Sequence, residues 1–449
     1  MMISAQSGRL ARVAAVVAVA GIGLAACSSD SGGSASTEAA TEGAATGTIS
    51  IWAHQGQESE VAALQAAVSG FNSSQSDVTA ELKLIPEADY TKSVTAASAE
   101  ELPDVLEIDG PNVAAMVYDA KIQPVSGFVS PDTVSNQTAS IKVQNTVNDG
   151  LYAISQFNAG LGLAGNKEML DAAGVKYPTS LDDAWTADEF TAAVTALAAK
   201  APGGKALDIK ENYSLSSEWG TFGFSPIIWS AGGNLLQDGK AEGVLNSPDA
   251  VAAMKQFQSW KPFIDPNTND DAFTTGAVAL SWFGHWMYPD YSKALGDKLV
   301  VMPLPAWGDG VKTGQGSWTW GVSANTQSGP AAGKFLDYLA SDESVKAMTT
   351  ANGAPPATTS ALAADTLYAE GGALNLLAQQ LDKSCGTTPA KDCVAVSRPV
   401  TAGYPVVTKA FSDALDAIYK GTDPQQALDA AAKAIDTDFA DNDGYELTK

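Results

Sequence analysis

Alternating and helix-spaced apolar positions follow one another along the chain after residue 47. Thr48–Ala53 alternates between apolar and polar residues as a strand does, and Glu58–Phe71 carries its apolar residues at helical spacing. Val78–Ile85 alternates again, Asp89–Ala99 is compatible with a helix, and Asp104–Ile108 is a short apolar strand. This strand–helix–strand–helix–strand order is typical of a parallel sheet with crossover helices, so the pattern predicts the α/β fold class.

Further along, Thr186 and Glu189 have the spacing of a capping box, which predicts a helix that continues through Phe190–Ala199. The folded body is expected to run from residue 48 to residue 449. About four hundred residues exceed what a single hydrophobic core normally holds, and this length favours two lobes.

The amino-terminal residues have the pattern of an export signal. Arg9 and Arg12 accompany an apolar stretch, Ala14–Ala26, which is too short and too rich in small residues to span a membrane stably. Its ending, Leu-Ala-Ala-Cys27, resembles a bacterial lipoprotein signal, in which the cysteine is lipidated and becomes the first mature residue. We expect residues 1–26 to be the signal peptide and Cys27 to hold the protein at the outer face of the cytoplasmic membrane. The alternative is an ordinary secretory signal with an incidental cysteine.

The segment after Cys27 has the composition of a tether. Residues 28–47 contain no large apolar side chain and consist of Ser, Gly, Ala and Thr with a few acidic residues. Such a segment buries too little surface to fold and behaves as a flexible linker, which at this length reaches roughly 25 Å on average. We expect residues 27–47 to tether the folded body to the bilayer.

The charge of the chain narrows the range of partners. The formal net charge is −25 at pH 7. A strongly acidic surface repels nucleic acids and anionic lipid headgroups, so neither is an expected partner, and the membrane should be reached only through the lipid anchor. No later segment approaches the length of a membrane-spanning helix.

Two further cysteines, Cys385 and Cys393, follow late in the sequence. In an oxidising compartment they most simply form a disulfide that closes a small loop. A zinc site is the weaker interpretation, because neither of the two histidines, His54 and His285, lies near them in the sequence.

Eight segments spread over nearly the whole mature chain carry a family resemblance. They are PDVLEID (Pro103–Asp109), GLYAISQFNAGLGLAGNKEMLDAAGV (Gly150–Val175), WTADEFTAAVTAL (Trp185–Leu197), IWSAGGNLLQDG (Ile228–Gly239), AFTTGAVALSWFGHW (Ala272–Trp286), VVMPLPAWGDG (Val300–Gly310), GSWTWGVSANT (Gly316–Thr326) and KFLDYLASDESVKAMTTANGAPPA (Lys334–Ala357). In this order they resemble the carbohydrate-binding, maltose-binding-protein-like family of extracellular solute-binding proteins, the receptors of ABC importers.

The resemblance implies a two-lobed periplasmic-binding-protein fold, with hinge crossovers and a ligand cleft between the lobes. On this basis we expect the first lobe to comprise residues 48–157 and 314–360. The second lobe is expected to comprise residues 158–313 and 361–449, the latter including the C-terminal helices. The chain should cross between the lobes near Phe157–Gly162, Pro303–Gly314 and Pro355–Ala364.

Tryptophan is concentrated between residues 219 and 320, where eight of the ten tryptophans lie. Sugars are recognised by flat aromatic faces against their C–H patches and by polar groups for their hydroxyls. The resemblance implies cleft positions for Trp219, Trp229, Trp286 and Trp318. The alternative for each of them is packing in the core of the second lobe, which we expect for Trp260.

Four polar residues complete the expected ligand site. Arg398 is the only arginine after Arg12, and its fork of donors suits paired hydroxyls or a carboxylate, although an ion pair with one of the many acidic residues is equally compatible. Asp109 ends the third strand, where parallel α/β sheets place ligands and the family often has a carboxylate; its alternative role is a helix N-cap. Gln57 follows the first strand and Gln156 lies at the first crossover, and both are expected to face the cleft.

Two local patterns point to other sites but carry little weight. Gly160–Gly165 matches the dinucleotide pattern G-x-G-x-x-G, but its alternating leucines favour a strand. Asp265–Asp270 faintly resembles the start of a calcium loop, but the sixth position is not glycine and the twelfth, Gly276, is not glutamate. The sequence has no zinc-protease, P-loop or nucleophile-elbow motif, so we expect no metal, no cofactor and no catalysis.

These features together predict a monomeric, lipid-anchored receptor that captures a mono- or oligosaccharide and delivers it to the permease subunits of an ABC importer. The same receptor fold for a polyol phosphate or a peptide is one alternative. A surface glycoside hydrolase is another, and it would need two carboxylates at one glycosidic bond, for which the candidates are Glu58, Asp109, Glu218 and Asp290.

Overall fold

The computed structural model describes residues 43–446. The expected signal peptide, residues 1–26, and the expected lipidation site, Cys27, lie outside the described residues. So does the expected tether up to residue 42.

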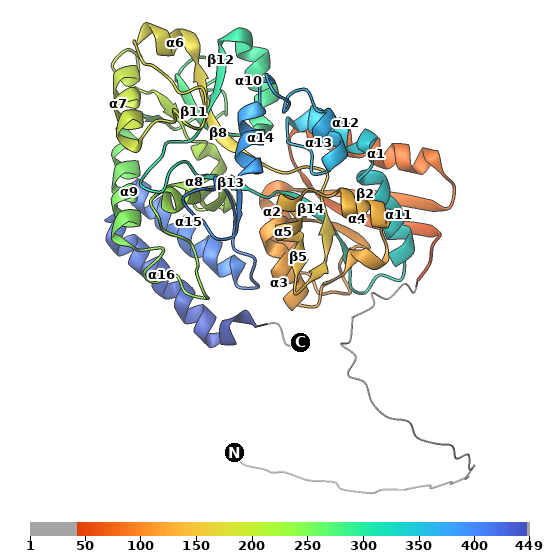
Figure 1. Ribbon diagram of the computed structural model, residues 1–449. Helices are drawn as coiled ribbons and strands as arrows, with labels where there is room; N and C mark the ends of the chain where they lie inside the picture. Colours follow the sequence, from red (N-terminus) through yellow and green to blue (C-terminus); the bar gives the residue numbers. More distant parts are fainter. Residues whose placement is uncertain (1–42, 447–449) are drawn as a thin grey trace, which may run out of the picture. The chain divides into compact units, whose positions relative to one another are not determined.

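The first lobe is built on a sheet with the strand order β2-β1-β3-β14-β4, in which β7 also pairs with β14. Of these strands, β2 and β14 are labelled in Figure 1. β1 is parallel to both β2 and β3, as the alternating segments predicted, whereas β14 runs antiparallel to β3. The strands are β1 (Gly47–Gln55), β2 (Val78–Pro86), β3 (Val105–Asp109), β4 (Ile122–Gln123), β7 (Ala153–Ile154) and β14 (Trp318–Ser323).

Two helices connect the parallel strands of this sheet, and both were predicted. α1 (Glu58–Ser74) buries Leu64, Val68 and Phe71, which are part of its predicted apolar stripe. α2 (Glu87–Ala96) begins earlier than the predicted Asp89 and ends earlier than Ala99, because the backbone of Ala97 is extended. The amino-terminal half of the predicted α/β pattern is therefore confirmed.

The second lobe has its own sheet, with the strand order β10-β9-β11-β8-β12. β9 is parallel to β10 and β11, and β8 runs antiparallel to β11 and β12. The Gly160–Gly165 segment lies mostly in β8, inside this sheet, and is a buried strand rather than a phosphate-binding loop. The strands are β8 (Leu161–Asn166), β9 (Leu207–Asp208), β10 (Ile264–Asp265), β11 (Leu280–Gly284) and β12 (Leu299–Met302).

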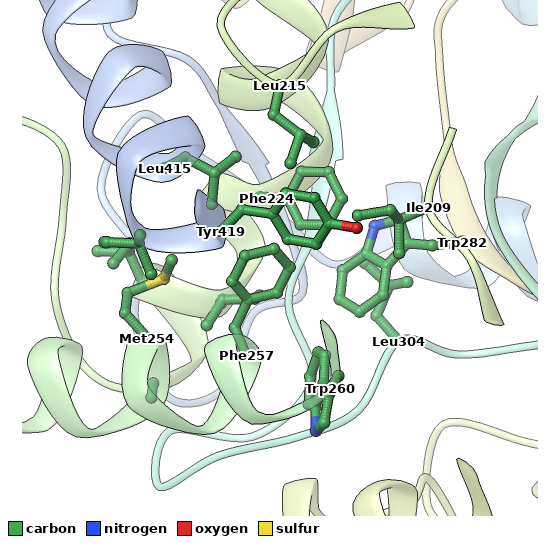
Figure 2. Close-up of a cluster of buried hydrophobic side chains, with 14 of the residues drawn as sticks. Ile209, Leu215, Phe224, Met254, Phe257, Trp260, Trp282, Leu304, Leu415 and Tyr419 are labelled. Atoms are coloured by element: carbon green, nitrogen blue, oxygen red, sulfur yellow. The ribbon is translucent and has the colours of Figure 1, made fainter. Parts of the chain in front are cut away.

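Helices of the second lobe enclose the largest hydrophobic core of the described chain. Figure 2 shows part of this core, where the rings of Phe224 and Trp282 stack at 5.3 Å and Phe257 packs beside Trp260. Trp260 is fully buried, as predicted. The helices are α7 (Ala187–Ala198), which begins with the predicted capping box, α8 (Glu218–Ser230), α9 (Pro248–Ser259), α15 (Tyr404–Lys420) and α16 (Pro424–Asp441).

A small three-stranded sheet leads into the C-terminal helices. β16 (Ala395–Ser397) pairs in parallel with β13 (Thr313–Gln315) and with β15 (Ser384–Gly386). The predicted disulfide between Cys385 and Cys393 is present and closes the loop that joins β15 to β16. Because this loop is covalently closed, the short strand that precedes Arg398 has a constrained position.

The chain passes between the two sheets three times. It leaves β7 and enters β8 after residue 160, and it returns from β12 through β13 to β14. The third passage runs from α12 (Asp342–Asn352) through α13 (Thr359–Ala364) to α14 (Asn375–Asp382), and Pro356 there pairs with Phe157 of the first passage. The expected lobe boundaries at residues 157, 313 and 360 stay predictions, although each lies on or close to one of these passages.

The remaining elements cover the two sheets or connect their strands. Among residues 43–446, no helix is long and apolar enough to cross a membrane. The elements are α3 (Val113–Tyr118), α4 (Pro131–Asn136), α5 (Ala139–Asn145), β5 (Thr146–Val147), β6 (Gly150–Leu151), α6 (Lys167–Ala172), α10 (Tyr288–Leu295) and α11 (Gly329–Leu339), with short 3₁₀ turns at Gly110–Asn112, Val125–Gly127, Glu211–Tyr213, Lys261–Phe263, His285–Met287, Gly296–Lys298 and Asp443–Tyr445.

The loop that resembled a calcium site is occupied by a lysine. The Nζ of Lys210, a fully buried residue, lies 3.2 Å from Asp208 and also pairs with Asp270 at the end of that loop. Burial lowers the pKa of this ammonium, but the attraction of both carboxylates outweighs burial and raises the pKa. Among the described residues, no group of three or more His, Cys, Asp or Glu side chains is placed to hold a metal ion.

Candidate functional site

Three strand ends bring the predicted residues of the first lobe together. β1 and β3 are parallel neighbours, so their carboxyl ends meet at one edge of the sheet, and β14 begins at the same edge because it is antiparallel. Trp318, the first residue of β14, is therefore paired in register with Asp109, the last residue of β3. The imidazole of His54, near the end of β1, stacks on the Trp318 indole with ring centroids 4.0 Å apart and planes 11° from parallel.

His54 is held by a buried carboxylate that the sequence analysis did not identify. Its Nδ1 lies 2.7 Å from Oε2 of Glu107, and its backbone N–H donates to the same oxygen at 3.1 Å. Burial lowers the pKa of His54, but the charge and hydrogen bond of Glu107 outweigh burial and raise the pKa to about 9. The ring is therefore protonated at neutral pH, and its charge lies over an electron-rich indole face, which is a favourable cation–π arrangement.

Gln57 and Glu60 lie at the start of α1, and the charge of Glu60 is near His54. Gln57 is half-buried and is the residue before the first helical turn, where its side chain makes no capping hydrogen bond. Glu60 accepts a hydrogen bond from Asn352 Nδ2 at 3.3 Å. Burial raises the pKa of Glu60, although the nearby charge of His54 lowers it. The edge of the first sheet thus combines polar and acidic side chains with the half-buried indole of Trp318.

In the second lobe, Trp286 lies in the turn after β11 and packs against two aromatic residues at the start of α8. Trp286, which is half-buried, packs against Trp219 at 5.9 Å and against Phe222 at 6.4 Å. Trp219 is buried, and its Nε1–H donates to the carbonyl oxygen of Ile209 at 3.0 Å. Of these two predicted tryptophans, Trp286 is half-buried, whereas the burial of Trp219 gives no support to its predicted ligand contact and lets it pack against Trp286 instead.

Trp229 was also predicted to contact ligand, but the structure places it elsewhere. It is fully buried near the carboxyl end of α8, and its Nε1–H donates to Oδ1 of Asn234 at 3.1 Å. This position belongs to the core of the second lobe, which was the alternative considered for each tryptophan. The prediction of a ligand contact therefore has no support for Trp229.

Arg398 lies where the two lobes meet. Its Nη2 is 3.2 Å from Oδ1 of Asp109 in the first lobe, and its Nη1 is 2.7 Å from Oε1 of Glu218 in the second. The guanidinium carbon lies 4.5 Å from the centre of the Phe222 ring. Of the two roles that the sequence left open for Arg398, the ion pair is present and is formed with another predicted site residue, and the ligand contact stays a prediction.

Asp109 has an unusual electrostatic environment as a result. Burial raises the pKa of this carboxyl, the guanidinium of Arg398 lowers it and the charge of Glu218 raises it, with a net pKa of about 6. The alternative role of Asp109 as a helix cap is not realised, because its side chain makes no capping hydrogen bond to the following turn. Its carboxylate is used for the interlobe contact.

Gln156 lies on the first passage between the sheets, as predicted. Its side chain is almost completely buried, yet neither its amide nitrogen nor its amide oxygen has a hydrogen-bond partner within residues 43–446. A buried amide without partners costs free energy, and such groups in native proteins call for an explanation such as a bound polar group. The backbone carbonyl of Gln156 accepts from Ala357, which ties it to the third passage.

His285 is a further residue at the lobe boundary that sequence reasoning did not select. It lies in the second lobe, and its Nδ1 is 3.1 Å from the carbonyl oxygen of Asn352, at the end of α12. Burial lowers the pKa of His285 to about 4, so this ring is neutral where His54 is charged. The rarity of histidine, with two in 449 residues, was a signal that could have identified both rings.

The sequence also contained partial signals for the roles of Glu107 and Glu218. Glu107 is a charged residue inside an apolar strand, and such a residue is normally paired when it is buried. Glu218 was named only as a possible hydrolase carboxylate, yet Arg398, Tyr404 and Thr408 all donate to it. Both carboxylates act here as hydrogen-bond acceptors in fixed networks.

Taken together, the two lobes present aromatic rings, paired carboxylates and one guanidinium at their common boundary. Trp318 and Asp109 come from the first lobe, and Trp286, Phe222 and Arg398 come from the second. Such a set offers flat apolar faces together with several donors and acceptors, which suits a polar ligand with apolar patches.

The comparisons with known proteins agree with this architecture. The family model described as bacterial extracellular solute-binding protein matches residues 66–374, more than half of the chain. The GacH receptor of Streptomyces glaucescens is 22% identical, with a TM-score of 0.71 over 90% of this chain and 100% of that one. A cyclic alpha-maltosyl-1,6-maltose binding protein from Arthrobacter globiformis is 23% identical, with a TM-score of 0.68 over 87% of this chain and 98% of that one.

T. maritima MalE3, solved with maltose bound, has a TM-score of 0.73 at 19% identity, covering 87% of this chain and 99% of that one. At these identities the likeness establishes the fold, and the family match establishes membership. The chain belongs to the bacterial extracellular solute-binding proteins, a family of extracytoplasmic binding proteins, and it has the two-lobed fold of its solved neighbours.

Proposed function

We propose that this chain is the sugar-binding receptor of an ABC importer and binds its ligand where the two lobes meet. The observation that carries the proposal is the boundary itself, where aromatic rings and hydrogen-bonding side chains of both lobes converge: Trp318, Asp109, Trp286 and Arg398. Aromatic faces beside paired polar groups are the usual means of recognising sugars. Solved neighbours with this fold are described in complex with acarbose, tagatose and maltose.

The mechanism that follows is hinged closure without catalysis. A ligand that touches both lobes favours the closed form by its higher affinity for that form. The three passages between the sheets are the segments that would bend. The closed receptor would then dock on the permease, held near the membrane by a lipid on Cys27, a residue outside the described part of the chain.

The proposal is tested by a thermal-shift screen of the full chain against monosaccharides, disaccharides, maltodextrins, polyols, polyol phosphates, amino acids and peptides. A ligand at one hundred times its dissociation constant adds about 2.7 kcal/mol of stability to the native state. We expect stabilisation by one or more neutral sugars. Stabilisation by phosphates or peptides alone would contradict the sugar assignment, and hydrolysis of an oligosaccharide during incubation would favour the glycosidase alternative.

Replacing Trp318 with alanine is expected to weaken binding of the sugar found in that screen by about 1–3 kcal/mol. Its half-buried indole stacks on His54 and is paired in register with Asp109, so an aromatic ring and a carboxylate lie together at this edge of the first sheet. Isothermal titration calorimetry of the variant and the parent measures the change.

Trp307→Ala is the matched control for this variant. Trp307 is also half-buried, but it packs against Trp260 and donates to Gln256, away from the lobe boundary. Its replacement should leave the affinity unchanged. Equal affinities of Trp318→Ala and the parent, with the fold intact by circular dichroism, would assign Trp318 a packing role instead.

A further inference from the structure

Arg398 connects the lobes through two carboxylates that belong to different sheets. Asp109 ends β3 of the first lobe, and Glu218 begins α8 of the second. Arg398 itself follows β16 and precedes α15, which packs against α8, so the arginine belongs to the second lobe. Its side chain is only 5% exposed and that of Asp109 is 10% exposed, so their contact is shielded from water, whereas the Glu218 side chain is 32% exposed.

The two carboxylates hold the guanidinium unequally. Glu218 is 2.7 Å from Nη1, whereas both oxygens of Asp109 are more distant, at 3.2 and 3.4 Å from Nη2 and Nη1. Glu218 is itself immobilised within its own lobe, because the hydroxyls of Tyr404 and Thr408 also donate to it. When the lobes separate, Arg398 should stay with Glu218 and release Asp109.

We propose that Arg398 is an interlobe clamp that stabilises the closed form of the receptor, with or without a ligand, and that Glu218 is the positioning residue that aims it at Asp109. The attraction within such a pair falls as water enters, and removing one partner leaves the other charge buried without compensation. The clamp therefore favours full closure over partial closure.

One donor of Arg398 indicates how a ligand would engage the clamp. Within residues 43–446, its Nε–H is buried and has no acceptor, although the two terminal nitrogens are both paired. An uncharged oxygen such as a hydroxyl would satisfy this donor, whereas an anion would also meet two carboxylates that compete for the same guanidinium. This part of the inference rests on the proposed function, and the clamp itself does not.

Other contacts across the boundary lack this charge. The ring of His285, which is neutral, lies within hydrogen-bond distance of the carbonyl of Asn352. Tyr118 of α3 packs against Tyr445 with ring centroids 5.6 Å apart. Both are neutral contacts. Removing the charge of one carboxylate should therefore affect closure more than removing any one of these contacts.

The test measures the distance between the lobes without ligand. Spin labels are attached to Lys92→Cys on α2 and Lys433→Cys on α16, two exposed lysines on opposite lobes, in a full chain that also carries Cys27→Ser and keeps its disulfide. Double electron–electron resonance of this parent should show a population at the short distance of the closed form. Glu218→Gln and Asp109→Asn should each reduce this closed population in favour of longer distances.

Two further variants separate the clamp from a general loss of packing. Asp208→Asn removes a carboxylate from the buried Lys210 cluster inside the second lobe, and it should leave the interlobe distance unchanged. Glu218→Asp keeps the charge and should restore part of the closed population. If Glu218→Gln does not fold, Asp109→Asn in the other lobe tests the same contact.

The clamp is overturned if both neutralised variants fold and keep the distance distribution of the parent. It is also overturned if Asp208→Asn shifts the distances as far as they do. Because no sugar is present, these outcomes are independent of the ligand screen. A receptor that binds no sugar but opens when Asp109 is neutralised would contradict the proposed function and support the clamp.

Discussion

Replacing Trp229 with alanine is expected to lower the free energy of unfolding by about 4 kcal/mol, the usual scale for removing a buried tryptophan. The side chain is fully buried in the core of the second lobe, so truncation leaves a cavity among close-packed neighbours. Its hydrogen-bond partner is not left without a donor, because Oδ1 of Asn234 also accepts from the backbone of Leu235. The loss should therefore come almost entirely from packing, and urea denaturation at neutral pH measures it.

Trp286→Ala is the comparison for this result. Trp286 is on the same lobe and packs against Trp219 and Phe222, but it is only half-buried. Its replacement should cost about half as much stability, since the transferred area is smaller. A loss below about 1 kcal/mol for Trp229→Ala would contradict a core position and return this residue to the candidate ligand contacts.

Raising the pH from about 6 to about 9.5 is expected to remove about 3 kcal/mol of stability that His54 contributes. The folded-state pKa of His54 is about 9, well above the ordinary value of 6.5. Between these two values the native state holds a proton that the unfolded state has released. The stabilisation is therefore complete below about 6.5 and is lost as the pH rises through about 9.

The measurement is the free energy of unfolding of the parent and of His54→Gln across this pH range. The difference in free energy of unfolding between the parent and His54→Gln should shrink as the pH rises. Glu107→Gln should abolish most of the pH dependence that His54 causes, because Glu107 raises the pKa of His54. His285, whose lowered pKa is about 4, affects stability only below about pH 6.5, and because it does so in both proteins its effect cancels in the comparison. Parallel pH profiles of parent and His54→Gln would show that the buried ring is neutral.

The sequence predicted those parts of the fold that depend on interactions between residues close together in the chain. The alternation in Thr48–Ala53 and Val78–Ile85 identified two parallel strands, because a strand with one buried face must alternate. Thr186 and Glu189 identified the start of α7, since a capping box is complete within four residues. The pairing of Cys385 with Cys393 needed only their closeness in sequence and an oxidising compartment.

The four tryptophans show where local chemistry stops being informative. Trp219 and Trp229 lie on the same helix and have the same side chain, yet one supports the boundary and the other is enclosed in the core. Their places depend on which neighbours pack around α8, and α15, one of those neighbours, lies nearly two hundred residues later in the sequence. Trp318 faces the boundary only because β14 is antiparallel and begins beside Asp109.

The sequence by itself therefore determined the fold class, the family resemblance, the disulfide and a set of candidate residues, because each of these is written in short patterns or in their order. Only the tertiary structure decided how the candidates interact. Asp109 and Arg398 are 289 residues apart in the chain, and each had two open roles until the lobes placed them in contact. Charge pairing depends on distance and burial in three dimensions, and neither quantity can be read from residues that are remote in sequence.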